Sequence, residues 1–253
     1  MSFNVAADAY DRFMGRYSRH LAPQMADLGD AEAGQRVLDV GCGPGALTSE
    51  LVARVGAASV AAVDPSPPFV EAARERHPGV DVRQASADAL PFDDGAFDAA
   101  LAQLVVHVMP DPVAGLREMA RVTRQGGVVV ACVWDHAGGE GPLGAFWNAV
   151  RELDPSAPDE SELPGARRGH LQQLFEAAGL HDVGETSLDS RVEHPTFEDW
   201  WEPFTGGVGP AGAYVAALDD PRRNALRDRC RAILGPAPFV ITARAWAARG
   251  VVA

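Results

Sequence analysis

An apolar run that enters a glycine-rich turn limits this chain to few kinds of fold. Residues 37–45 read VLDVGCGPG, and apolar side chains at helical spacing come directly after them. This order predicts a short buried strand, a turn and a helix. Gly41 and Gly43 have no Cβ, so the turn can approach a ligand closely, and the helix N-terminus points its N–H groups to the same place. Glycine turns are common, so the interpretation depends on the residues further along the chain.

Size and composition exclude several classes of protein. The chain has 253 residues, 47% of them hydrophobic and 23% charged, which is typical of a globular protein. We expect a single domain over residues 1–253 and no membrane span, because no apolar run approaches about 18 residues. The net charge of −13 disfavours nucleic acid. Three scattered cysteines are too few for a disulfide framework or a zinc site, so we expect no metal and a reducing cytoplasm.

The N-terminal segment carries aromatic side chains at helical spacing. Residues 6–22 form one amphipathic pattern, and we expect an N-terminal helical cap within residues 1–30. The apolar face consists of Tyr10, Phe13, Met14, Tyr17 and Leu21. Either this helix packs on the core, or its aromatic side chains close over a ligand.

Strand and helix patterns alternate over residues 31–134. The predicted strands are residues 37–40, 59–63, 80–83, 97–103 and 128–134. Gly126 and Gly127 are expected to end a helix just before the last of these strands. Such alternation favours a mainly parallel sheet with helices on both faces.

The second half of the chain is less regular. Two further strands are expected near residues 182–192 and 239–247, and residues 195–236, about 42 positions, lie between them. We therefore predict a doubly wound, mainly parallel, seven-stranded, Rossmann-like α/β sheet with a helical insertion before its last strand. The insertion is expected to form a substrate lid or, as the alternative, a dimer contact. Three tryptophans either line an acceptor pocket or pack in the core: Trp147, Trp200 and Trp201.

Three acidic residues stand at matching places along the alternating pattern. Asp39 precedes the glycine turn, Asp64 ends the second strand and Asp88 comes after the third. Ligands bind open parallel sheets at the carboxyl ends of the strands, so the three side chains should share one crevice. Asp64 is placed to accept hydrogen bonds from both hydroxyls of a ribose, and Asp88 from an adenine amino group. One such residue alone could be a turn or N-cap residue, but three in register favour a nucleotide site.

Two nucleotide classes fit this crevice. Residues 41–46 satisfy the dinucleotide fingerprint with alanine in third place, which keeps an NAD-dependent oxidoreductase as an alternative. Asp39, however, puts negative charge where a pyrophosphate would lie. A ligand with a cationic amino group would suit that charge, so the carboxylate favours S-adenosylmethionine.

Several segments resemble one family of proteins. Residues 37–45 resemble the first motif of the class I S-adenosylmethionine-dependent methyltransferases, and residues 62–66 (AVDPS) resemble their second motif. Residues 87–98 (ADALPFDDGAFD) resemble the segment after the third strand in the small-molecule branch that includes quinone C-methyltransferases. Residues 116–127 (LREMARVTRQGG) resemble the helix before the fifth strand.

The resemblance covers residues 6–134 well and is diffuse over residues 135–253. It implies that residues 31–134 form a cofactor-binding core for S-adenosylmethionine, with S-adenosylhomocysteine as the product. The implied contacts are Asp64 with the adjoining Pro65 for the ribose, Ala87 and Asp88 for the adenine, Gly41 and Gly43 for the methionine part, and Gln103 beside the sulfonium. Residues 10–17 resemble a helix that covers the cofactor, which makes Tyr10 and Arg16 candidate contacts.

The expected reaction is methyl transfer to a small-molecule acceptor by in-line displacement. Alignment of acceptor, methyl and sulfur can supply roughly 7–11 kcal/mol, so no obvious catalytic residue is required. His107 and His136, which come after the fourth and fifth strands, are candidates for a general base or a substrate contact. A protein that binds S-adenosylmethionine without methyl transfer remains an alternative, and both a monomer and a homodimer remain open.

Overall fold

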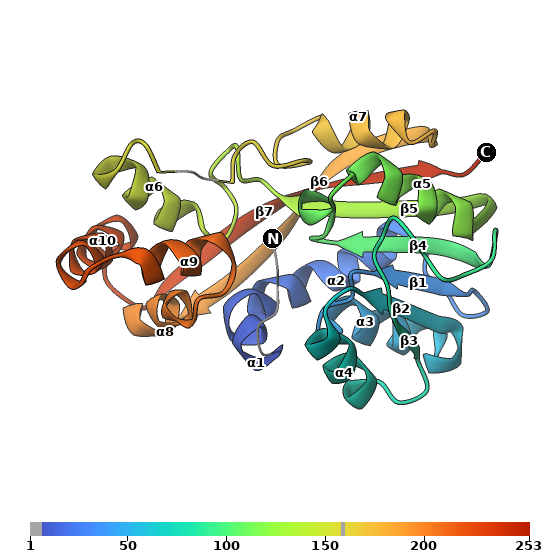
Figure 1. Cartoon of the computed structure of the whole chain (residues 1–253), viewed down its shortest axis with the longest axis horizontal. Helices are drawn as coiled ribbons and strands as arrows, with labels where there is room; N and C mark the ends of the chain where they lie inside the picture. Colours follow the sequence, from blue (N-terminus) through green and yellow to red (C-terminus); the bar gives the residue numbers. More distant parts are fainter. Residues whose placement is uncertain (1–6, 158–159) are drawn as a thin grey trace.

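A mixed sheet of seven strands organises the computed structural model, which describes residues 7–157 and 160–253 (Figure 1). The strand order is β3-β2-β1-β4-β5-β7-β6. Strands β1 to β5 run parallel, whereas β7 runs antiparallel to both of its neighbours, β5 and β6. The predicted doubly wound, mainly parallel α/β fold is confirmed. The strands are Val37–Val40 (β1), Val60–Asp64 (β2), Asp81–Gln84 (β3), Phe97–Gln103 (β4), Thr123–Trp134 (β5), His181–His194 (β6) and Phe239–Val251 (β7).

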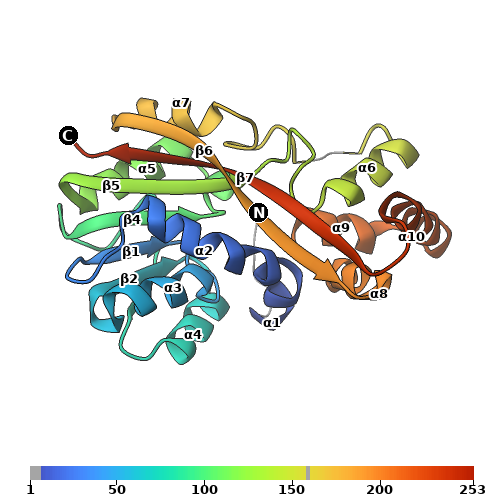
Figure 2. The same ribbon diagram turned by 180° about the vertical axis from the view of Figure 1, so that it is seen from behind.

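Helices cover both faces of the sheet because its strands are apolar on both sides. Successive residues of β1 show this: Val37 packs in the cluster under α2 and α3, and Leu38 packs in the cluster under α5 and α7. Figure 2 shows α2 and α3 in front of the sheet, on the face opposite α5. The covering helices are Arg16–Leu28 (α2), Ala46–Val55 (α3), Pro67–Arg76 (α4), Pro112–Val122 (α5) and His170–Ala177 (α7), with short 3₁₀ turns at Ala57–Ser59 (η2) and Val106–Val108 (η3).

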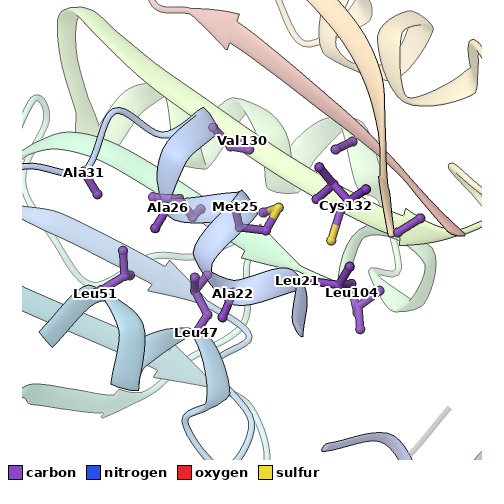
Figure 3. Close-up of a cluster of buried hydrophobic side chains, with 14 of the residues drawn as sticks. Leu21, Ala22, Met25, Ala26, Ala31, Leu47, Leu51, Leu104, Val130 and Cys132 are labelled. Carbon is purple, nitrogen blue, oxygen red and sulfur yellow. The ribbon is translucent and has the colours of Figure 1, made fainter. Parts of the chain in front are cut away.

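The largest apolar cluster lies between α2, α3 and the sheet (Figure 3). Leu21 and Met25 of α2 are completely buried, as is Leu51 of α3. Cys132 of β5 lies in the same cluster, and the thiols of Cys42, Cys132 and Cys230 are all buried and unpaired. Two alternatives were predicted for the helix over residues 6–22: packing on the core or closure over a ligand. The contacts of Leu21 and Met25 show that its second half packs on the core.

That N-terminal segment is longer and less uniform than its pattern predicted. It consists of a short α-helix, Ala7–Tyr10 (α1), a π-helical turn, Asp11–Gly15 (η1), and α2, which continues to Leu28. In the π-helical turn the aromatic residues no longer keep the 3.6-residue period, so Tyr10 and Phe13 point away from the core that Leu21 and Met25 enter.

Gly126 and Gly127 do not separate a helix from a strand, which corrects the prediction. Both lie inside β5, which begins at Thr123. The reason is cross-strand pairing: Gly126 N donates to Val252 O, and Val252 N donates to Gly127 O, each at 2.9 Å. A Cβ on Gly127 would meet Asp98 O at 2.5 Å, so the close strand contact requires glycine there.

The predicted helical insertion lies between β6 and β7. It comprises Phe197–Trp201 (α8), the 3₁₀ turn Glu202–Gly206 (η4), Gly209–Ala217 (α9) and Asp220–Leu234 (α10). Strands β6 and β7 extend beyond the rest of the sheet, and the insertion packs at their far end together with Gly144–Leu153 (α6) (Figures 1 and 2). These helices share a third apolar cluster with Phe13 of η1.

Within residues 7–157 and 160–253, no helix is long and apolar enough to cross a membrane. The same residues contain no group of three or more His, Cys, Asp or Glu that could hold a metal ion.

Candidate active site

The glycine turn leaves β1 at its carboxyl end and is tied to the neighbouring strand. The amides of Gly41 and Cys42 both donate to Val63 O, at 2.8 and 2.9 Å. Gly41 has a φ of +71°, and a Cβ there would meet Val105 at 2.5 Å. A Cβ on Gly43 would meet nothing within 4 Å, so this part of the turn faces open space. The turn is therefore fixed in place and open toward a ligand.

Asp39 is a buried carboxylate next to this turn. Thr48 Oγ1 donates to Asp39 Oδ2 at 2.6 Å, whereas Oδ1 is buried and has no hydrogen-bond partner among the described residues. Burial, opposed by the bond from Thr48, raises the pKa of Asp39 to about 7. A buried acceptor without a partner costs free energy until a donor binds it.

Asp64 at the end of β2 holds the turn from the other side. Its Oδ2 accepts from Gly43 N at 2.9 Å, and its Oδ1 accepts from Ser66 N at 2.8 Å. Burial raises its pKa, although both backbone donors act in the opposite direction. Each carboxylate oxygen can accept more than one hydrogen bond, so hydroxyl groups can still bind here. Pro65 comes directly after it and accepts from Gln84 Nε2 at 3.2 Å.

The third acidic residue lies at the end of the neighbouring strand, as its position in the sequence suggested. Asp88 is exposed in the loop after β3, and Ala87 is half-buried beside it. Arg121 shapes this loop because its guanidinium donates to Leu90 O and Phe92 O, at 3.0 and 2.9 Å. The topology thus places Asp39, Asp64 and Asp88 at the carboxyl ends of three adjacent strands.

Gln103 and Tyr10 border the same crevice. Gln103 Nε2 donates to Ser18 O of α2 at 3.0 Å, and its buried Oε1 has no hydrogen-bond partner among the described residues. The Tyr10 ring lies 5.3 Å from the ring of Phe69. Burial, reinforced by the negative charge of Asp64, raises the pKa of Tyr10 well above its usual value.

Arg16 is directed elsewhere. Its guanidinium donates to Asp199 Oδ2 at 2.7 Å, where β6 meets α8. His194 lies between them, with Nδ1 at 2.8 Å from Asp199 Oδ2 and Nε2 at 2.8 Å from the hydroxyl of Tyr17. Arg16 therefore joins the N-terminal segment to the insertion, and these contacts give no support to a cofactor contact.

A cavity adjoins the crevice, and we name it the β4–β5 cavity because the residues after those two strands form its base. Its volume is about 510 Å³ when the open solvent space at its mouth is included. Its walls come from α1 and η1, from the chain after β4 and β5, and from the start of α9. They consist of Tyr10, Phe13, Met14, Leu104, His107, Trp134, His136, Leu143, Glu160 and residues 208–211.

Leu104 stands where the crevice and the β4–β5 cavity meet. It comes directly after Gln103 and precedes Val105, which contacts the glycine turn. Its φ of +62° lies in the left-handed region, which is strained for a residue with a Cβ, and its N–H donates to Cys132 O at 2.9 Å. Such strain is often found at functional sites, which makes Leu104 a candidate member of this one.

Three polar residues stand out among the apolar walls of the cavity. The rings of His107 and His136 lie 5.9 Å apart. His136 Nδ1 lies 3.8 Å from Oε2 of Glu160, which also accepts from Trp147 Nε1 at 2.7 Å. Burial, with a smaller effect of His136, lowers the pKa of His107 to about 3, so His107 is neutral at physiological pH.

Two of the candidate substrate tryptophans occupy the core of the insertion. Trp200 and Trp201 are almost completely buried, at 2% and 5% exposure, and their rings lie 4.7 and 5.9 Å from Phe204. Neither lines the β4–β5 cavity. Trp147 does not line this cavity either, but its Nε1 donates to Glu160, which does. Sequence reasoning missed Glu160, because it lies in an irregular segment without a periodic pattern.

The residues of the crevice fit a nucleotide that carries an ammonium group. Asp39 Oδ1 and Gln103 Oε1 are buried acceptors that lack donors among the described residues. Asp64 and Asp88 supply further acceptors at neighbouring strand ends. An all-acceptor set suits hydroxyl, amino and ammonium donors better than it suits a pyrophosphate.

Comparisons with known proteins agree with this chemistry. A family model described as "Methyltransferase domain" matches residues 38–131. An uncharacterized methyltransferase of Mycobacterium bovis is 36% identical over 194 residues, which span 74% of this chain and 71% of the relative. A probable phthiotriol/phenolphthiotriol dimycocerosates methyltransferase 2 of Mycobacterium ulcerans is 39% identical over 66% of this chain and 69% of its own length.

The fold is also similar to that of solved structures. The YcgJ protein from Bacillus subtilis superposes with a TM-score of 0.59 at 22% identity, over 92% of this chain and 97% of that protein. An identity this low shows a shared architecture only, and the membership of a family rests on the sequence matches.

Proposed function

This chain belongs to the class I S-adenosylmethionine-dependent methyltransferases, and from that membership we propose that it methylates a small molecule held in the β4–β5 cavity. The observation that carries the proposal is the position of the cavity. It opens beside Leu104, between the strand ends that form the cofactor crevice and the insertion that covers them. An acceptor there would lie next to the transferable methyl group.

S-adenosylmethionine supplies a methyl group that its sulfonium has already activated. We propose that Asp39 Oδ1 accepts from the ammonium group and Gln103 Oε1 lies beside the sulfonium. Asp64 would accept from the ribose hydroxyls, and Asp88 with the Ala87 backbone would bind the adenine. Tyr10 would cover the ribose side, which the packing of its ring against Phe69, five residues after Asp64, supports.

The walls of the β4–β5 cavity indicate the chemistry of the acceptor. Aromatic and aliphatic side chains dominate, with Phe13, Leu104 and Trp134 among them. Such walls exclude water and hold an apolar ring or chain, so that positioning supplies most of the rate, roughly 7–11 kcal/mol. The relative from Mycobacterium ulcerans is named for triols, which supports an acceptor with hydroxyl groups.

Methyl labelling of a fractionated cell extract tests the proposal. The protein is incubated with S-adenosylmethionine that carries a radioactive methyl group, and the mixture is separated into an ultrafiltrate and a macromolecular fraction. Chromatography then resolves unreacted S-adenosylmethionine from labelled products in the ultrafiltrate, so that only label in products is counted. We expect labelled product in the ultrafiltrate, and less of it with the Asp64→Ala variant when S-adenosylmethionine is below saturation. Label found only in the macromolecular fraction would contradict a small acceptor. A binding protein without transfer activity would label neither fraction, although S-adenosylhomocysteine would still raise its melting temperature.

We also propose that the protein works in the cytoplasm. Three buried, unpaired thiols support a reducing compartment, where cysteines remain free.

A further inference from the structure

One end of the β4–β5 cavity carries a histidine that is paired with a buried carboxylate. Glu160 is only 7% exposed, and its Oε2 lies 3.8 Å from His136 Nδ1. Trp147 Nε1 donates to the same oxygen at 2.7 Å, which orients the carboxylate toward the imidazole. The cofactor crevice uses neither His136 nor Glu160.

The chain fixes His136 at the end of β5. Asp135 caps the loop after that strand, because its Oδ1 accepts from Gly138 N at 2.8 Å and its carbonyl accepts from Gly141 N at 3.0 Å. His136 N donates to Trp134 O at 2.8 Å. These bonds hold the backbone of His136 beside the cavity, and Glu160 lies on the Nδ1 side of its imidazole.

We propose that His136, oriented by Glu160, accepts the proton of a hydroxyl group on the methyl acceptor, and that His107 holds that hydroxyl by a hydrogen bond. The inference rests on the proposed function, because it assigns an acceptor class to the same cavity. A carboxylate beside an imidazole stabilises the imidazolium that forms when the ring takes a proton. His107 Nδ1 is buried and has no hydrogen-bond partner among the described residues, so it can bind a hydroxyl.

Methylation of a hydroxyl group releases its proton, and a base must accept that proton. The acceptor oxygen forms a bond to the methyl carbon while the carbon–sulfur bond breaks and sulfur keeps the electron pair as a thioether. The hydroxyl proton passes to His136, and it leaves to solvent after the product departs. A phenolic hydroxyl, ordinarily ionised only near pH 10, is mostly un-ionised at neutral pH, so removal of its proton accelerates the transfer by about 10²–10⁴-fold.

Phenol and thiophenol form a matched pair of probes for this base. Both have one ring, but thiophenol is readily ionised near neutral pH and needs no base. We expect the Glu160→Gln variant, which keeps the acceptor for Trp147, to methylate phenol at least tenfold more slowly and thiophenol at the rate of the parent protein. The His136→Gln variant should lose phenol methylation by about 10²-fold. Glu140→Gln is the control, because Glu140 lies on the same loop but pairs with Arg244 outside the cavity.

Histidine NMR provides a readout that needs no acceptor. Among the residues that the structure describes, the titratable groups that line the same cavities as His136 are Tyr10, His107, Arg151 and Glu160. NMR chemical shifts of the His136 imidazole are followed as the pH is varied. In the Glu160→Gln variant we expect the midpoint of this titration to fall by about one pH unit or more, because an opposite charge within about 4–6 Å is removed. Glu140→Gln should leave it unchanged.

The outcomes separate this inference from the proposed function. If Glu160→Gln and His136→Gln both methylate phenol at the parental rate, His136 is not the base. The proposed methylation of a small molecule is unaffected by that result. Transfer to thiophenol but never to phenol overturns the hydroxyl acceptor. If neither probe is methylated, the NMR titration decides: an unmoved His136 midpoint overturns the pairing, whereas a shifted midpoint supports it. Failure of the extract labelling, in contrast, refutes the proposed function itself.

Discussion

Asp39 should make cofactor binding depend on pH, and the dependence can be calculated. Burial raises the pKa of this carboxyl to about 7, while an ammonium group binds its ionised form. With a pKa of about 7, about 3% of the carboxyl is ionised at pH 5.5 and about 76% at pH 7.5. The affinity for S-adenosylhomocysteine should therefore rise about 25-fold between these two pH values, which corresponds to about 1.9 kcal/mol.

The same group lowers the stability of the ligand-free protein as pH rises. A carboxyl whose pKa is higher in the folded state favours folding most below its unfolded pKa, and that contribution is lost between about pH 4 and pH 7. The full loss is about 4 kcal/mol for a shift from 3.8 to about 7. Asp39→Asn removes this loss of stability, but it leaves a buried amide donor unpaired. That unpaired donor costs about 1–3 kcal/mol of folding free energy. At pH 8 the variant should thus unfold with a free energy about 1–3 kcal/mol higher, yet bind the cofactor more weakly.

Isothermal titration calorimetry with S-adenosylhomocysteine measures the change in binding. At pH 6.5, binding should release about 0.8 proton, seen as a difference in heat between buffers of unequal ionisation enthalpy. Asp39→Asn should release none and bind with a pH-independent affinity. Asp30→Asn is the control, because Asp30 forms an ion pair with Arg249 at the surface. Equal heats in both buffers with the parent protein, together with a flat affinity from pH 5.5 to 7.5, would refute the assignment of Asp39 to the ammonium group.

The contacts of the site support three further predictions. Asp64→Ala should weaken S-adenosylmethionine binding by about 1–3 kcal/mol in calorimetry, because ribose hydroxyls and the turn lose a charged acceptor; an unchanged affinity would remove the ribose assignment. Trp201→Ala and Trp200→Ala should each lower the free energy of unfolding in urea by about 3–5 kcal/mol, since both rings fill a core, and loss of turnover at parental stability would instead favour a substrate contact. Cofactor should slow proteolysis around Tyr10, and equal cleavage with and without it would assign that segment to packing alone.

The sequence predicted the elements whose structure depends on local patterns. The strand–turn–helix unit that starts at Val37 results from apolar periodicity and glycine chemistry, both of which act between near neighbours. The positions of Asp39, Asp64 and Asp88 result from the parallel order, because parallel strands place their carboxyl ends along one edge. Their assigned roles as ligand contacts remain predictions that calorimetry can test.

Elements that depend on distant contacts were beyond such reasoning. Gly126 and Gly127 look like a helix stop, but pairing with Val252 near the end of the chain makes them part of β5. Trp200 and Trp201 look equally suitable for a pocket wall and for a core, and only the packing against Phe204 decides between them. No local pattern distinguishes Glu160 from the other acidic residues of its loop, since its partners His136 and Trp147 come from other elements.

The two interpretations of the N-terminal segment are compatible, because the π-helical turn divides it into two faces. Leu21 of α2 packs on the sheet, whereas Phe13 of η1 meets Phe204 of the insertion in a T-shaped contact at 5.0 Å. Arg16, between these two positions, pairs with Asp199 at 2.7 Å. A movement of the insertion that opens the β4–β5 cavity must therefore separate both pairs or move the N-terminal segment with it. Because Tyr10 lines the cavity and is a candidate cofactor contact, we expect opening for the acceptor to be coupled to the cover of the cofactor.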